Sequence, residues 1–201
     1  PEAKADTGNL LLLEHPEADA VTDALRSGKD VLLLGKAPFV SLPTSFQIAL
    51  AGRTGGNLAT VINDHPALSG MPHDGFCGWQ FRRLLEGGSA VCFENREVPF
   101  DPIIEVASSH KNAIRQSILF EFHALEGRLL VSGFQFGEED PAAQWLKAQL
   151  IRYAQSEAFD PAYRLNEAQL DALIHGKTVK TAENTNRAFN PNDKAARRKN
   201  K

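Results

Sequence analysis

The sequence predicts an α/β domain built on an open, mostly parallel β-sheet, with helices on the faces of the sheet and one antiparallel hairpin. Three observations indicate this fold. The chain begins with a strand, a helix and a strand joined by short loops, which is typical of a parallel sheet. A later block is rich in β-branched and aromatic residues, which favour strands. Two further segments combine helical periodicity with residues that begin helices.

The N-terminal part supplies the parallel pattern. Residues 9–13 and 31–34 are short apolar runs, as expected for buried strands. Between them, residues 16–27 carry apolar side chains at helical spacing, and Gly28 is well placed to end a helix. This order predicts a first βαβ unit.

The middle of the chain is less regular. Residues 37–56 are rich in proline and glycine and are expected to be mostly loop, with a short strand at 46–50. A strand is predicted at 60–63, followed by an ordered loop over 64–78 and a short helix over 79–85.

The most strand-like part follows. Residues 90–93 form another apolar run, and strands are predicted at 103–107, 117–124 and 128–136. The last two are separated by residues 125–127, a length that suits a hairpin loop.

Two helices are predicted near the C-terminus. Asp140 can cap a helix whose first residue is Pro141, because proline tolerates the first helical turn. A final short helix is expected over 167–174, with Asn166 as its cap and Gly176 as its stop. The first of these helices has an apolar face made by Trp145, Leu146, Leu150, Tyr153 and Ala154.

Length and composition fit one soluble domain with extensions. We expect a linker over residues 1–8, an α/β domain over 9–176 and a basic polar tail over 177–201. The polar start reads as a linker inside a longer polypeptide, so any targeting signal is expected upstream. The longest apolar run, residues 10–13, is far shorter than the roughly 20 residues of a membrane span.

The charge is unevenly distributed along the chain. The tail holds eight Lys or Arg and two acidic residues, a balance of +6, whereas the preceding 176 residues hold 14 basic and 23 acidic residues, a balance of −9. The tail is expected to be solvated or lightly docked. Nucleic-acid binding is not expected, because an acidic body offers no basic face to phosphates.

Nucleophilic catalysis finds weak support. In α/β amidotransferases and hydrolases, the turn after a central strand carries Cys or Ser. Here that turn holds Lys36 and Ala37. His15 follows the first strand, but no nucleophile accompanies it. Cys77 lies between glycines before a short helix, and is the most serious nucleophile candidate.

Metal and cofactor sites are not expected. The six histidines lack the spacing of a helical zinc site, and no CxxC accompanies them. His65 and His73 share a loop with Asp64 and Asp74, where a satisfied hydrogen-bond network is preferred over a weak cation site. Cys77 and Cys92 are interpreted as buried thiols rather than a bridge. No catalytic residue is assigned.

One loop could bind a carbohydrate. Phe76 and Trp79 offer aromatic faces for a sugar ring, and His73 and Asp74 offer polar groups for its hydroxyls. The alternative is that these aromatics anchor the core. These four residues are the candidate ligand site.

Five short motifs lie in order between residues 63 and 161. They are His65-Pro66, Trp79-Gln80, Phe120-Glu121, Gly127-Arg128-Leu129-Leu130 and Arg152-Tyr153-Ala154. This ordered set resembles a C-terminal domain of bacterial β-galactosidase-like proteins of glycoside hydrolase family 2, in which a His-Pro start, a Trp-Gln pair, a Phe-Glu strand and a Gly-(Lys/Arg)-Leu-Leu strand recur in this order.

The resemblance implies a flavodoxin-like sheet of the class I glutamine amidotransferase type that lacks the catalytic triad. It also implies a larger, exported parent enzyme that acts on glycans. The first hypothesis is therefore a non-catalytic accessory domain that packs on the upstream catalytic domain or supports a homo-oligomer. The alternatives are a carbohydrate-binding module and a small stand-alone hydrolase or amidotransferase using Cys77.

Overall fold

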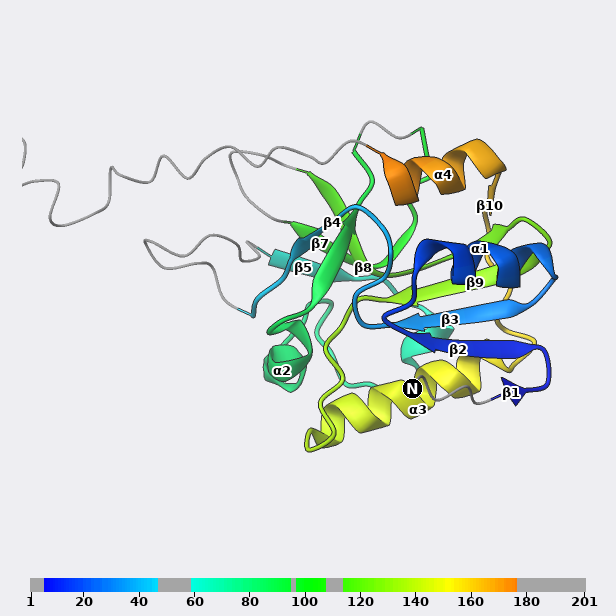
Figure 1. Ribbon diagram of the computed structural model, residues 1–201. Coiled ribbons are helices and arrows are strands. Elements are labelled where there is room, and N and C mark those ends of the chain that lie inside the picture. The colour runs from blue at the N-terminus through cyan, green and yellow to red at the C-terminus, as the bar shows by residue number, and fades with distance from the viewer. Residues whose placement is uncertain (1–5, 47–58, 95–96, 108–113, 177–201) are drawn as a thin grey trace, which may run out of the picture.

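The computed structural model shows an α/β fold with one open sheet between two layers of helices (Figure 1). It describes residues 6–46, 59–94, 97–107 and 114–176. The strands are β1 (Asp6–Thr7), β2 (Leu10–Glu14), β3 (Asp30–Leu34), β4 (Ser41–Pro43), β5 (Ala59–Ile62), β6 (Ser89–Cys92), β7 (Pro102–Ala107), β8 (Arg115–Ala124), β9 (Gly127–Ser132) and β10 (Arg164–Leu165). The helices are α1 (Ala18–Arg26), α2 (Arg82–Leu85), α3 (Pro141–Ala154) and α4 (Glu167–His175), with single 3-10 turns η1 (Pro66–Leu68) and η2 (Trp79–Phe81).

The described sheet is mixed rather than mostly parallel. Strands β2, β3 and β9 run parallel to one another, and β10 runs parallel to β8. Six other pairings are antiparallel, and three of them involve β8, with β6, β7 and β9. The expectation was wrong because only the βαβ unit at the N-terminus shows its strand direction in the sequence. The direction of the later strands is set by pairing across long separations.

Strand β8 is the centre of the sheet. Its N-terminal half pairs with β6 on one edge and β7 on the other, since Gln116 and Ser117 have partners in both strands. Its C-terminal half pairs with β9, and its last two residues also pair with β10. The ten residues of β8 thus have partners in four strands.

Each face of the sheet buries its own apolar cluster. Helices α1 and α4 cover one face, while α2 and α3 cover the other (Figure 1). The alternation of side chains along β3 shows how this works: Leu32 and Leu34 belong to the cluster under α3, and Val31 and Leu33 belong to the cluster under α1. Every residue of β3 is buried, which explains why the sequence shows a continuous apolar run there.

The predicted helix ends are confirmed. The side chain of Asp140 accepts a hydrogen bond from the backbone N–H of Ala142 at the start of α3. Asn166 and Gln169 form a reciprocal capping box at the start of α4. The predicted β8–β9 hairpin is also confirmed, with Ala124 opposite Gly127.

Three element predictions need correction. Strand β4 lies inside the segment that was expected to be loop, and Asp6–Thr7 of the expected linker pairs with β2 as β1. Strand β9 ends at Ser132 instead of continuing to residue 136. The chain leaves the strand at Gly133, where a Cβ atom would lie 1.9 Å from the carbonyl oxygen of Ser89. Residues 47–50 of the strand expected at 46–50, and the tail expected at 177–201, lie outside the described residues.

An ion pair between β3 and β9 also contacts the segment that follows α3. Asp30 is nearly buried and accepts two hydrogen bonds from Arg128, at 2.8 Å from Nε and 2.6 Å from a terminal nitrogen. The hydrogen bond with Asp30 raises the pKa of Arg128 above its ordinary value, so the guanidinium stays charged. The guanidinium also lies over the ring of Phe159, 4.7 Å from its centroid.

Candidate functional site

The loop between β5 and η2, residues 63–78, carries the predicted ligand site. It is fastened at both ends to the sheet. The N–H of Asn63 donates to the carbonyl of Ile103 at 3.0 Å, and the N–H of Cys77 donates to Thr60 Oγ1 at 2.8 Å. In the middle, the N–H of Ile62 donates to the carbonyl of Gly75 at 2.8 Å. The loop therefore follows the edge strand β5 closely and is an ordered part of the fold.

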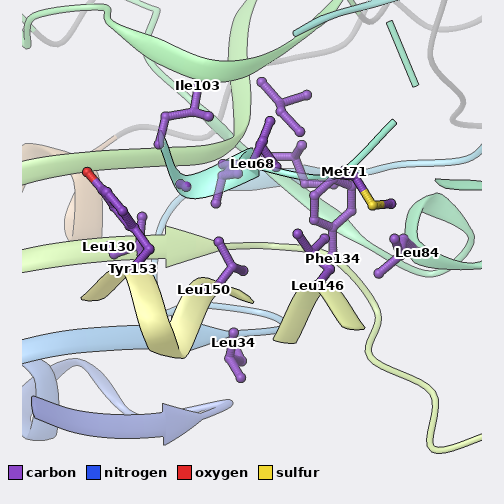
Figure 2. Packing of buried hydrophobic residues seen from close by; sticks show 14 of the residues in the cluster. Leu34, Leu68, Met71, Leu84, Ile103, Leu130, Phe134, Leu146, Leu150 and Tyr153 are labelled. Carbon is purple, nitrogen blue, oxygen red and sulfur yellow. The ribbon is translucent and has the colours of Figure 1, made fainter. Parts of the chain in front are cut away.

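The same loop is also held by apolar contacts. Ala67, Leu68 and Met71 are buried in the cluster that α3 covers. Figure 2 shows Leu68 and Met71 beside the side chains of Phe134 and Leu146. Burying a Leu or Met side chain contributes roughly 1.5–3 kcal/mol. These contacts stabilise one loop conformation without a regular strand or helix over its whole length.

A buried polar cluster joins the loop to β8 and α3. The hydroxyl of Tyr153 donates to Glu121 Oε2 at 2.8 Å, and His65 Nε2 lies 3.6 Å from Glu121 Oε1. The rings of His65 and Tyr153 meet edge to face, with centroids 5.4 Å apart. In Figure 2, Tyr153 reaches up from α3 with its oxygen at the margin of the apolar cluster. We call these three residues the Glu121 cluster.

The hydrogen bonds fix the chemical state of the Glu121 cluster. His65 Nδ1 accepts from the N–H of Ala67, so a neutral His65 carries its proton on Nε2, facing Glu121. Burial, followed by the charge of Glu121, raises the pKa of Tyr153, so the phenol stays protonated and keeps donating. The arrangement satisfies a carboxylate whose side chain is only 9 % exposed. Its three residues therefore act as a structural clamp.

The four predicted ligand residues lie on the outer part of the loop. Trp79 is 71 % exposed and Phe76 is 51 % exposed, so neither is a core anchor. Asp74 is exposed, while His73 is half-buried and accepts the N–H of Gly75 through Nδ1 at 3.2 Å. The ring partner of Trp79 is Phe46, with centroids 5.1 Å apart. The structure thus exposes both aromatic rings but places Phe46, which the sequence analysis missed, against Trp79.

Two arginines extend this exposed surface. Trp79 begins the helical segment η2–α2, and Arg82 and Arg83 follow it by three and four residues, so all three side chains share one helix face. Both arginines are exposed, whereas Phe81 and Leu84 point into the core. Their guanidinium groups form no hydrogen bond or ion pair within the described part of the chain. Phe46, Trp79, Arg82 and Arg83 are called the Trp79 surface below.

The turn after β3, where an amidotransferase-like nucleophile would stand, is closed. Gly35 has a φ of +78°, and a Cβ atom there would lie 2.5 Å from the imidazole of His15. The N–H of Lys36 donates to His15 Nδ1 at 3.2 Å, and the N–H of Gly35 donates to the carbonyl of Ser132. His15 therefore fills the space above the turn, and the exposed Lys36 lacks the desolvation that a nucleophilic amine needs.

Comparison with known families identifies the chain. The model of the domain of unknown function DUF8487 matches residues 14–175. The chain belongs to this family. The match covers α1 to α4, the Glu121 cluster and all four residues of the Trp79 surface. A search of curated proteins finds no match.

The two cysteines of this DUF8487 domain are buried thiols, as predicted. Burial raises the pKa of the Cys77 thiol to about 12, and a hydrogen bond involving Thr60 opposes this only in part. A thiol with such a pKa supplies very little thiolate near neutral pH. Cys77 therefore lacks the lowered pKa of an activated thiol, and its backbone N–H holds the end of the loop to Thr60.

The histidines of the loop are used as hydrogen-bond acceptors. His65 and His73 each accept a backbone N–H two residues ahead, which matches the preferred interpretation as a loop network. Within the described ranges, no group of three or more His, Cys, Asp or Glu side chains is placed to hold a metal ion. Likewise, no described helix is long and apolar enough to cross a membrane.

The clamp role of the Glu121 cluster predicts a stability effect. We expect Tyr153→Phe to lower the free energy of unfolding by about 1–3 kcal/mol, because it removes a buried hydrogen bond to a carboxylate. Since the raised pKa of Tyr153 stabilises the fold below the ordinary tyrosine value of 10.0, that contribution falls as pH rises above it. The slope of stability against pH above about 10 is therefore shallower in the variant.

Urea unfolding of the chain, the variant and a matched control measures this effect. Tyr163→Phe removes a hydroxyl from a tyrosine that is 48 % exposed, and a loss below about 0.5 kcal/mol is expected. Glu121→Gln and the double variant complete a thermodynamic cycle. Additive losses in that cycle would show that Tyr153 and Glu121 are not coupled, contrary to the clamp.

Proposed function

We propose that this chain is a non-catalytic accessory domain of a larger bacterial protein that acts on glycans and is related to family 2 glycoside hydrolases. In this proposal the sheet derives from a flavodoxin-like, class I glutamine amidotransferase-type fold that lacks the triad. The domain packs on an upstream catalytic domain of the same polypeptide, or supports a homo-oligomer, and is exported with it.

The observation that carries the proposal is the closed turn after β3. The imidazole of His15 occupies the space that a side chain at Gly35 would need, and the next two positions hold Lys36 and Ala37 rather than a Cys or Ser nucleophile. Ligands of open α/β sheets commonly bind beyond the carboxyl ends of the parallel strands. At this turn His15 fills the space above Gly35, and the N–H groups of Gly35 and Lys36 are both hydrogen-bonded, which favours a scaffold over an enzyme.

The Glu121 cluster supports the resemblance on which the parent is inferred. The His-Pro start, the Phe-Glu strand and the segment ending in Tyr153-Ala154 lie far apart in sequence, yet one residue from each meets the others in the cluster. A joint physical role accounts for such residues occurring together in one order. The joint role of His65, Glu121 and Tyr153 favours a shared fold, whereas the glycan-acting parent protein is inferred from the resemblance itself.

Carbohydrate recognition is a second candidate function, favoured by the exposure of Trp79. An indole that is 71 % exposed carries a large apolar area in contact with water, and the ring of Phe46 lies against it, so the two form an aromatic patch. The flat face of the indole suits stacking against the C–H groups of a sugar ring. His73, Asp74 and Phe76 lie on the loop that leads to it and would surround a bound saccharide.

The third hypothesis, catalysis by Cys77, predicts a reactive thiol and is tested on the isolated chain. In a Cys92→Ala background, we expect iodoacetamide at pH 8 to modify Cys77 at least ~100-fold more slowly in the folded than in the urea-unfolded chain. The reason is the shift of its pKa from 9.0 to about 12, which lowers the thiolate fraction at this pH by about tenfold per unit.

The same preparation is assayed with nitrophenyl glycosides, nitrophenyl esters and glutamine. The accessory-domain proposal predicts no turnover that depends on Cys77. Rapid folded-state alkylation, together with turnover that is lost in Cys77→Ser, would instead establish a thiol enzyme.

The proposed parent is tested by the genomic sequence that precedes the first codon. We expect an uninterrupted reading frame that encodes a catalytic domain with two carboxylates across a glycan-binding cleft, because glycoside hydrolysis needs such a pair. A stop codon and a separate start site directly before this domain would contradict the proposal and leave an independent protein.

A further inference from the structure

The arginines of the described chain fall into two groups. The guanidinium groups of five of the seven have a partner. Four bind a side chain, namely Arg26 with Glu167, Arg115 with Glu94, Arg128 with Asp30 and Arg152 with Gln149, and Arg164 binds the backbone carbonyl of Leu125. The other two, Arg82 and Arg83, are adjacent, exposed and without such a partner in the described ranges. They are also the two that share a helix face with Trp79.

An unpaired cationic pair stands out on this chain because the body is acidic. The 176 residues before the tail carry 14 basic and 23 acidic side chains, so carboxylates are in excess. Glu86 is the carboxylate nearest to the pair in sequence. Within the described ranges it accepts the N–H of Phe46 through Oε1 at 3.4 Å and forms no ion pair with Arg82 or Arg83. Both guanidinium groups are therefore available to an external anion.

The Trp79 surface is held in place before any ligand arrives. Phe46 packs against the indole of Trp79, with ring centroids 5.1 Å apart. The next residue, Gln80, donates through Nε2 to the carbonyl of Pro72 at 2.5 Å and fixes the start of the helical segment to the loop. Phe81 and Leu84 are fully buried and anchor its other face. The backbone of this segment and the indole are therefore positioned before binding, whereas Arg82 and Arg83 lose side-chain entropy when they bind an anion.

We infer that the Trp79 surface binds an acidic saccharide, in which one sugar ring stacks on Trp79 and a carboxylate of the saccharide binds Arg82 and Arg83. This inference rests on the second candidate function and adds the ligand class. Guanidinium groups match carboxylates in planar, two-point hydrogen bonding, whereas neutral sugars offer only hydroxyls. The pair thus gives a physical reason for preferring uronate-containing glycans to neutral ones.

A polynucleotide also combines stacking rings with negative charge, but the rest of the molecule disfavours it. Nucleic-acid binding requires a broad basic face that follows many phosphates. Here two arginines stand on a body with a net negative balance of 9 charges, which repels a long polyanion. A short acidic saccharide with one carboxylate per ring needs only the local pair.

The test is calorimetric titration of the chain with tetragalacturonate and with its fully methyl-esterified form, which has the same rings but no charge. We expect saturable binding of tetragalacturonate at least tenfold tighter than that of the ester. Arg82→Gln/Arg83→Gln should weaken tetragalacturonate binding tenfold or more and leave the ester unchanged. Trp79→Ala should weaken both ligands, because both stack.

The matched control is Arg26→Gln/Arg152→Gln, which changes net charge equally on α1 and α3. This control should bind tetragalacturonate and its ester with the same affinities as the unsubstituted chain. Equal affinity for acid and ester would overturn the acidic-saccharide inference and keep carbohydrate recognition. If a chain with the circular dichroism spectrum of a folded protein binds neither tetragalacturonate nor its ester, both the acidic-saccharide inference and carbohydrate recognition are overturned. The scaffold proposal then remains. Tighter binding to a single-stranded DNA tetramer than to tetragalacturonate would also overturn the inference.

Discussion

The fold depends on the hydrogen bonding of β8 along both of its edges. This ten-residue strand pairs with β6 and β9 on one edge and with β7 and β10 on the other. It thereby joins the parallel N-terminal strands to the antiparallel remainder. Its side chains serve both layers, because Phe120 and Phe122 fill the cluster under α1 and α4 while Glu121 faces His65 and Tyr153. Without β8, the group β1–β2–β3–β9 would have no described strand pairing to β6–β4 or to β7–β5.

The exposed aromatic side chains lie away from the carboxyl ends of the parallel strands, where an α/β sheet ordinarily binds ligands. At the carboxyl ends of the parallel strands, His15 packs on Gly35, and Glu14 forms an ion pair with Lys147 of α3. On the loop after β5, by contrast, buried side chains and the Glu121 cluster hold the chain while Phe76 and Trp79 remain exposed. The inner side chains of the loop stabilise it, and its outer aromatic side chains stay exposed to solvent.

Local features of the sequence predicted the fold well. Caps at Asp140 and Asn166, the 125–127 hairpin loop and the first βαβ unit are confirmed because neighbouring residues determine them. The mixed direction of the sheet, the His65–Glu121 contact across 56 positions and the Phe46–Trp79 contact were missed, since tertiary packing alone creates them. The candidate loop was identified from its aromatic residues, but periodicity could not tell exposed from core aromatics. The sequence likewise could not single out Arg82 and Arg83, because only tertiary structure gives every other described arginine a partner.

We propose that this domain recognises a saccharide through the anchored loop and the Trp79 surface, and not through the carboxyl ends of the parallel strands. The most direct test is to map amide and indole chemical shifts by nuclear magnetic resonance while tetragalacturonate is added. The account predicts the largest changes at the Trp79 indole N–H and at the backbone of Arg82 and Arg83, with little change at Gly35 and Lys36. Changes concentrated at Gly35 and Lys36, or none at the Trp79 surface at saturating ligand, would contradict it.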